Sequence, residues 1–118
     1  MGKLIHVVED DDDIRFIIEY VLAEAGYEVE SSSTVQGFFE SLKSHHPDLI
    51  LLDVMLPDGT GIDICRTVRT NDAIKHIKII MMSAHAAKTA VLEEACADDF
   101  ISKPFDLDLL TERIKRFI

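Results

Sequence analysis

The chain has 118 residues, 47% of them hydrophobic, which fits one folded domain and excludes a disordered chain. Its 22 acidic and 12 basic residues give a formal net charge of -10, which argues against direct binding to nucleic acid or to an anionic membrane. The two cysteines form no CxxC pair, and the chain shows no signal stretch or long apolar span, so we expect one domain, residues 1–118, in the reducing cytoplasm.

Short apolar runs alternate with helical patterns along the chain. The runs rich in β-branched and aliphatic residues predict strands over residues 3–9, 27–31, 47–54, 77–84 and 98–103. Apolar residues at helical spacing predict helices over residues 14–25, 35–42, 61 to about 70, 88–95 and 107–117, with Gly26 closing the first and Asp106 capping the last. This alternation predicts an α/β doubly wound (βα)5 domain, in which right-handed crossovers cover both faces of a parallel sheet.

The first predicted strand runs into five consecutive carboxylates, Glu9 to Asp13. The last three stand where the first helix begins, so they cap free backbone N–H groups and meet the positive end of the helix dipole, each worth about 0.3–1 kcal/mol. Glu9 and Asp10 precede the helix and gain little from this effect. Their presence at the strand end therefore calls for another explanation.

The other predicted strands also end in polar residues. The third ends in Asp53, the fourth in Ser83 and the fifth in Lys103. Ligands of doubly wound sheets bind beyond the carboxyl ends of the strands, where these side chains converge with Glu9 and Asp10. Three carboxylates in one pocket repel each other unless a cation binds. Mg²⁺ suits the pocket, because it prefers oxygen ligands and is typically held by one or two carboxylates plus a phosphate oxygen.

Nearly the whole chain resembles the receiver domain of two-component response regulators, through the motifs VVEDD, LILLDVMLPDGTGID, IIMMSAH and ADDFISKPF in this order. The resemblance implies a flavodoxin-like, five-stranded parallel sheet with the strand order 2-1-3-4-5. It implies that Asp53 is the phosphorylated residue. It also implies that Asp10, Asp53 and the backbone carbonyl of Met55 bind Mg²⁺ directly, with Glu9 acting through water.

The resemblance assigns three further roles: Lys103 is the lysine of the site, Ser83 the switch hydroxyl and Phe100 the switch aromatic. The chemistry agrees, since a carboxylate can attack phosphorus when metal and fixed donors neutralise the developing charge. Mg²⁺ and Lys103 would supply that neutralisation, and Ser83 would donate a hydrogen bond to a phosphoryl oxygen. We expect the domain to catalyse only its own phosphorylation and dephosphorylation.

The partners are also implied by the resemblance. The phosphodonor would be a phosphohistidine of a sensor histidine kinase or of a histidine phosphotransfer protein. Output would pass through the surface of the fourth helix, fifth strand and fifth helix to an effector domain, a target protein or a second copy in a phosphorylation-dependent homodimer. No direct contact with nucleic acid or membrane is expected.

Three local features extend the comparison with the family. Cys96 stands where the family commonly has a glycine, so the end of the fourth helix is expected to differ. His85 lies two positions after Ser83, where it is either a solvated imidazole or a side chain that orders or blocks the hydrolytic water. The motif SKPF predicts a cis peptide between Lys103 and Pro104.

Two other function classes remain open. An aspartate-nucleophile phosphohydrolase would place an acid two residues after the nucleophile, but that residue is Met55, and no inserted cap segment is present. A phosphorylation-independent pseudo-receiver would be expected to lose part of the acid and lysine set, and this chain keeps all of it.

Overall fold

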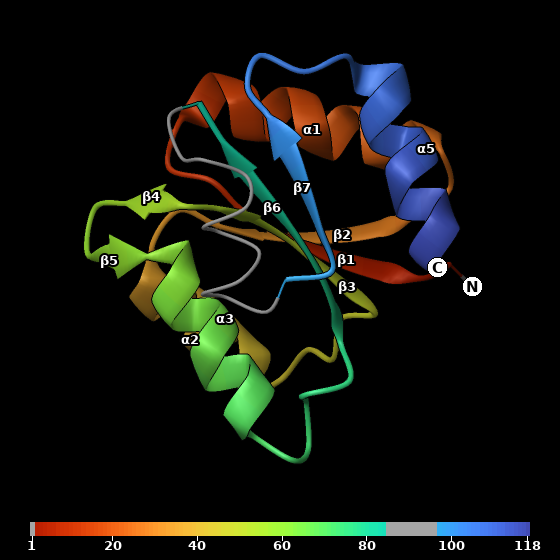
Figure 1. Cartoon of the computed structure of the whole chain (residues 1–118). Coiled ribbons are helices and arrows are strands. Elements are labelled where there is room, and N and C mark those ends of the chain that lie inside the picture. Colours follow the sequence, from red (N-terminus) through yellow and green to blue (C-terminus); the bar gives the residue numbers. More distant parts are fainter. Residues whose placement is uncertain (1, 85–96) are drawn as a thin grey trace.

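A five-stranded parallel sheet forms the centre of the computed structural model, which describes residues 2–84 and 97–118 (Figure 1). The strands are β1 (Leu4–Val8), β2 (Glu28–Ser32), β3 (Leu49–Asp53), β6 (Lys78–Ser83) and β7 (Asp99–Ser102). Their order is β2-β1-β3-β6-β7, which is 2-1-3-4-5 when the strands of this sheet are counted along the chain. The predicted flavodoxin-like fold is therefore confirmed.

Helices cover both faces of the sheet. The helices α1 (Asp12–Glu24) and α5 (Leu107–Phe117) lie on one face, and α2 (Val35–Leu42) and α3 (Gly61–Thr70) lie on the other (Figure 1). The core divides in the same way: Ile18 and Ile114 pack on the first side, and Phe38 and Ile64 on the second. All five residues of β3 are buried, which explains why its sequence is a continuous apolar run.

The ends of the helices follow the predicted caps. The Oδ1 atom of Asp11 accepts the N–H of Ile14 at 3.0 Å at the start of α1, and Asp106 accepts the N–H of Asp108 at 2.7 Å at the start of α5. After α1, Gly26 has a φ of 96°, a left-handed conformation that costs glycine little. Asp11 and Asp106 therefore cap the starts of α1 and α5, and Gly26 ends α1, as the sequence predicts.

A two-stranded antiparallel hairpin follows β3 and was not predicted. It consists of β4 (Met55–Leu56) and β5 (Gly59–Thr60), and strands of two residues are too short to produce a periodic pattern. The hairpin returns the chain to the end of β3, where the N–H of Gly61 donates to the carbonyl of Val54 at 2.8 Å. A Cβ atom on Gly61 would lie 2.3 Å from the Asp53 carbonyl oxygen, so this close approach requires glycine.

Three sequence predictions fall on the remaining segment. The helix expected over residues 88–95, the residue His85 and the departure at Cys96 lie outside the described residues. The predicted cis peptide between Lys103 and Pro104 is present.

Within residues 2–84 and 97–118, no helix is both long and apolar enough to cross a membrane.

Candidate phosphoacceptor and metal site

The polar residues predicted from the strand ends meet at the carboxyl edge of the sheet. They line a cavity of about 320 Å³, whose walls are formed by Glu9, Asp10, Asp11, Ile14, Asp53, Met55, Ser83, Ala84 and Lys103. Four different strands of the sheet bring these residues together, because the carboxyl ends of parallel strands lie at the same edge. The arrangement predicted for Glu9, Asp10, Asp53, Ser83 and Lys103 is thus present.

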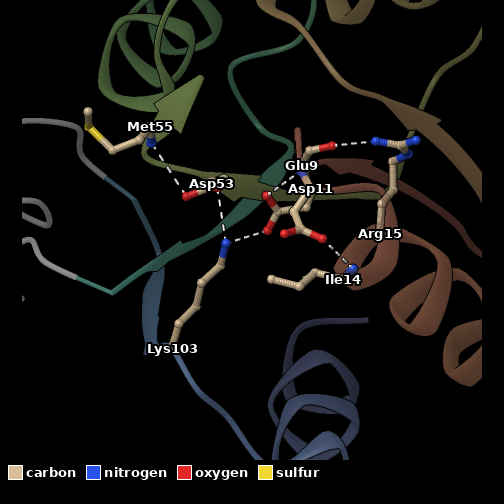
Figure 2. A network of polar contacts seen from close by, with 7 residues as sticks. All are labelled: Glu9, Asp11, Ile14, Arg15, Asp53, Met55 and Lys103. Atoms are coloured by element: carbon tan, nitrogen blue, oxygen red, sulfur yellow. Dashed lines mark hydrogen bonds and ion pairs between the residues drawn. The ribbon is translucent and has the colours of Figure 1, made fainter. Parts of the chain in front are cut away.

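Lys103 lies between two of the carboxylates (Figure 2). Its Nζ atom donates to Oε1 of Glu9 and, at 3.1 Å, to Oδ2 of Asp53. The side chains of Glu9 and Asp53 are buried, and buried charges are stable when they are paired. From the sequence, only a metal ion was expected to offset the repulsion among the carboxylates. In the structure, the ammonium group of Lys103 also offsets part of this repulsion.

The environment of Glu9 changes its proton affinity. Burial raises the pKa of the Glu9 carboxyl to about 7, the hydrogen bond from Lys103 opposes this rise, and nearby Asp53 adds to it. For Lys103, burial lowers the pKa, but the hydrogen bonds to Glu9 and Asp53 outweigh burial, so the pKa is raised overall. The lysine therefore keeps its positive charge next to Asp53.

The acidic residues have the composition and spacing of a site for a hard divalent cation. Carboxylate oxygens of Glu9, Asp10 and Asp53 all lie within 4.8 Å of one another. Glu9 and Asp53 are buried, and Asp10 is exposed and lines the cavity. The backbone of Met55 also faces the site, since its N–H donates to Oδ1 of Asp53 at 3.4 Å (Figure 2). The carboxylate oxygens of the three acidic residues fit Mg²⁺, so this group could hold a metal ion.

Ser83 ends β6 at the site, and Phe100 lies in the neighbouring strand β7. Ser83 is 3% exposed, and its backbone carbonyl accepts the N–H of Lys103 at 3.0 Å. Phe100 stands opposite Met81 in the ladder between β6 and β7 and is 4% exposed. The aromatic ring therefore belongs to the hydrophobic core.

Sequence reasoning missed two residues that hold the loops around the site. Arg15 donates from Nη1 to the backbone carbonyl of Glu9 at 2.9 Å. Asp58, in the turn of the hairpin, accepts the N–H groups of Val35 at 2.8 Å and Gln36 at 3.1 Å. Neither contact could be predicted from neighbouring residues. Arg15 lies three positions after Asp12, which suggests only a surface ion pair. Asp58 lies between proline and glycine, which suggests only a turn.

Comparison with known proteins gives the family. The model of the response regulator receiver domain matches residues 5–115 of this chain. The chain belongs to the response regulator receiver domain family. Among its relatives, the receiver domain is 37% identical over 119 residues to the transcriptional regulatory protein GltR of Pseudomonas aeruginosa, a match that covers 99% of this chain and 49% of GltR. The chain spans about half the length of the curated relatives that it matches.

Solved structures agree with this assignment. The chemotaxis response regulator CheY4 of Vibrio cholerae superimposes with a TM-score of 0.92 and 25% identity over 100% of both chains. The receiver domain of the sensor histidine kinase PA1611 from Pseudomonas aeruginosa superimposes with a TM-score of 0.89 and 27% identity, covering 99% of this chain and 98% of that one. That structure is described with a magnesium ion coordinated in its active-site cleft. The chain is thus a receiver domain of two-component response regulators, and neither the phosphohydrolase nor the pseudo-receiver is favoured.

Proposed function

We propose that residues 1–118 form one domain that accepts a phosphoryl group on Asp53, in an Mg²⁺-dependent transfer from a phosphohistidine. The donor would belong to a sensor histidine kinase or to a histidine phosphotransfer protein. The observation that carries this proposal is the contact between the Lys103 ammonium and Oδ2 of Asp53, beside two further carboxylates at the sheet edge. This arrangement combines a nucleophilic carboxylate with a fixed positive charge.

Each residue of the site has a role in the transfer. A carboxylate oxygen of Asp53 attacks phosphorus, the O–P bond forms as the P–N bond of the donor breaks, and the electron pair stays with the donor imidazole. Lys103 and the hydroxyl of Ser83 would donate to the oxygens of the transferred group. Mg²⁺, when bound, would neutralise charge on the phosphoryl group. Its ligands would be Asp10, Asp53 and the Met55 carbonyl, with Glu9 acting through water.

The surface next to the site supports a protein as the phosphodonor. On α1, Phe16 is 68% exposed, Ile17 47% and Tyr20 62%. A groove of about 460 Å³ runs between α1 and the segment after β7, and its walls are formed by Ile14, Ile17, Ile18, Ala84, Lys103, Pro104, Phe105 and Leu107. Exposed apolar surface of this kind favours contact with another protein, and Lys103 borders both the groove and the phosphoacceptor cavity.

The output of the domain is also a proposal. Phosphorylation would act on an effector domain or target protein, or would drive formation of a homodimer, and Phe100 would act in the switch together with Ser83. The relative GltR is named as a transcriptional regulatory protein, and this chain matches about half of it. We further propose a cytoplasmic location and a catalytic role limited to the domain's own phosphorylation and dephosphorylation.

The proposal is tested by phosphorylating the protein with acetyl phosphate in the presence of Mg²⁺. Intact mass should increase by one phosphoryl group in the wild type and in Asp72→Asn, a control in which a distant exposed carboxylate is removed. Asp53→Asn should show no increase, because the attacking oxygen is lost. Modification that survives in Asp53→Asn would refute the assignment, and steady turnover of a generic phosphate ester would instead support a phosphohydrolase.

A further inference from the structure

Arg15 binds the backbone of the loop that carries the two first carboxylates of the site. Its Nη1 atom donates to the carbonyl oxygen of Glu9, a contact drawn in Figure 2, and the two atoms are 2.9 Å apart. Its Nη2 atom lies 2.5 Å from Oδ1 of Asp12, and its Nε atom lies 3.8 Å from Oε1 of Glu19. The Arg15 side chain is only 21% exposed, whereas that of Asp12 is 86% exposed. The guanidinium is therefore oriented from α1 toward the end of β1.

Glu9 is attached to its surroundings at several other points. Its N–H donates to the carbonyl of Ser32 at 3.0 Å, and its Oε2 atom accepts the N–H of Asp11 at 3.2 Å. Its Oε1 atom accepts from Lys103. These contacts hold the N–H and the side chain of Glu9, and Arg15 adds the contact to its carbonyl oxygen.

The carbonyl of Glu9 and the N–H of Asp10 belong to one planar peptide unit. A hydrogen bond to the carbonyl oxygen therefore restricts the orientation of the whole peptide plane, and with it the position of the Asp10 backbone. Within residues 2–84 and 97–118, no hydrogen bond or ion pair reaches the Asp10 carboxylate, which is exposed and lines the cavity. Its location therefore depends on the backbone, and the Arg15 contact is one of the restraints on that backbone.

We propose that Arg15 is a positioning residue that holds Asp10 where it would bind Mg²⁺. This inference rests on the proposed function and adds to it a residue outside the cavity wall. Groups that orient metal ligands from behind contribute to metal affinity although they do not touch the metal. Arg15 acts in this way through a peptide plane rather than through the carboxylate of the ligand.

The sign of the effect on Mg²⁺ affinity separates positioning from simple electrostatics. Arg15 is a cation held against the carbonyl of Glu9, next to the carboxylate cluster. Removing a positive charge at that place would strengthen Mg²⁺ binding if charge were its main effect. Removing a restraint on the position of Asp10 would instead weaken Mg²⁺ binding. We therefore expect Arg15→Gln to bind Mg²⁺ about ten-fold more weakly than the wild type, the lower end of the loss seen for such supporting groups.

The experiment is an Mg²⁺ titration of the 118-residue chain, followed by amide chemical shifts, which report weak binding. Arg15→Lys should fall between wild type and Arg15→Gln, because an ammonium can donate to the Glu9 carbonyl but lacks the two-armed guanidinium geometry. Lys43→Gln is the matched control: Lys43 forms an exposed ion pair with Glu40 at 3.1 Å, and its removal changes the net charge equally. An Arg15→Gln affinity equal to or higher than that of the wild type would overturn the proposal.

A double-mutant cycle tests whether Arg15 acts through Asp10. In the Asp10→Asn background, Arg15→Gln should cause little further loss of Mg²⁺ affinity, because the ligand that it positions has already been removed. Fully additive losses would show that Arg15 acts elsewhere and would overturn the inference. Urea unfolding without Mg²⁺ is measured in parallel, since a merely structural role would lower stability and leave the Mg²⁺ affinity of the folded protein unchanged.

Failure of the inference is distinguishable from failure of the proposed function. If the wild type binds Mg²⁺ but Asp53 is not phosphorylated, the proposed function is wrong and the cycle still decides the role of Arg15. If Asp53 is phosphorylated and Arg15→Gln keeps its Mg²⁺ affinity, the inference alone is wrong. A wild type that binds no Mg²⁺ overturns the inference directly.

Discussion

His6 is a fully buried titratable side chain in β1, the strand that ends just before Glu9. Its Nε2 atom shares a hydrogen bond of 2.7 Å with Oγ of Ser32, and its ring packs edge-on against Phe38 with centroids 4.9 Å apart. Its Nδ1 atom has no hydrogen-bond partner among the described residues. Burial, with a smaller contribution from His45, lowers the pKa of His6 to about 4. The neutral ring is therefore part of the folded state.

We predict that His6 makes the domain less stable in acid. Histidine has a pKa of 6.5 in the unfolded chain and about 4 in the folded protein, so protonation favours the unfolded chain. The contribution of the neutral ring to the free energy of unfolding is therefore fully present above pH 6.5 and is lost as the pH falls toward 4. The loss amounts to about 3 kcal/mol of unfolding free energy. Urea unfolding between pH 7 and pH 4 measures it.

The matched variant for this prediction is His6→Gln, which keeps a polar side chain but has no proton equilibrium. The raised pKa of Glu9 acts in the opposite direction, because its neutral carboxyl favours the folded state at lower pH. The difference between wild type and His6→Gln as a function of pH isolates the histidine. Parallel pH curves for the two proteins would show that His6 does not cause the acid sensitivity.

At the scale of elements, Asp58 joins the hairpin of β4 and β5 to the start of α2. Its two carboxylate oxygens accept the first free N–H groups of the helix, from Val35 and Gln36, and Thr34 accepts the N–H of Gly37 at 2.9 Å. These hydrogen bonds hold the pKa of Asp58 below its usual range. The hairpin that carries Met55 is therefore anchored on a helix from another part of the chain.

We predict that Asp58→Ala destabilises the domain and loosens the hairpin. The N–H groups of Val35 and Gln36 would lose their acceptors, so the urea midpoint should fall and amide exchange at these two residues should accelerate. Asp72→Ala is the control, since Asp72 is exposed and pairs only with Lys75 among the described residues. Unchanged exchange at Val35 and Gln36 in Asp58→Ala would contradict the anchoring role.

At the scale of the whole molecule, the contacts of Ser83 bear on the prediction that it carries a signal away from Asp53. It ends β6, stands opposite Ser102 in β7, and accepts the backbone N–H of Lys103 at 3.0 Å. Beyond β7, Arg113 of α5 pairs with Asp99 at 2.8 Å. A displacement at Ser83 would thus reach β7 and α5 through backbone and side-chain contacts. If this surface has two arrangements, phosphorylation of Asp53 would change their populations only to the extent that it stabilises one arrangement more than the other.

We predict that Ser83→Ala leaves Asp53 phosphorylatable but weakens the response of the distant surface. The backbone pairing of β6 and β7 does not need the hydroxyl, and Lys103 remains beside Asp53. Amide chemical shifts along residues 97–118 are compared with and without Mg²⁺ and beryllofluoride, a phosphoryl mimic. Shift changes in Ser83→Ala as large as those in the wild type would exclude the hydroxyl as the relay.

Several features follow from local sequence and topology. Alternating apolar runs predicted the parallel sheet and the helices α1, α2, α3 and α5 that cover it. Asp11 and Asp106 predicted the starts of α1 and α5, because capping acts over a few residues. The convergence of Asp53, Ser83 and Lys103 also followed, since parallel strands end at one edge. The strand order and the roles of these residues came from the family resemblance, and the roles stay predictions.

The remaining features depend on how side chains from separate elements meet. Nothing near Lys103 in the sequence shows that its ammonium binds both Glu9 and Asp53, residues 94 and 50 positions away. The burial of His6 and the capping of α2 by Asp58 likewise arise from packing between distant segments. Periodicity tells which face a side chain occupies, but rotamers, distances and the proton affinity of Glu9 are set by the atoms that packing places around it.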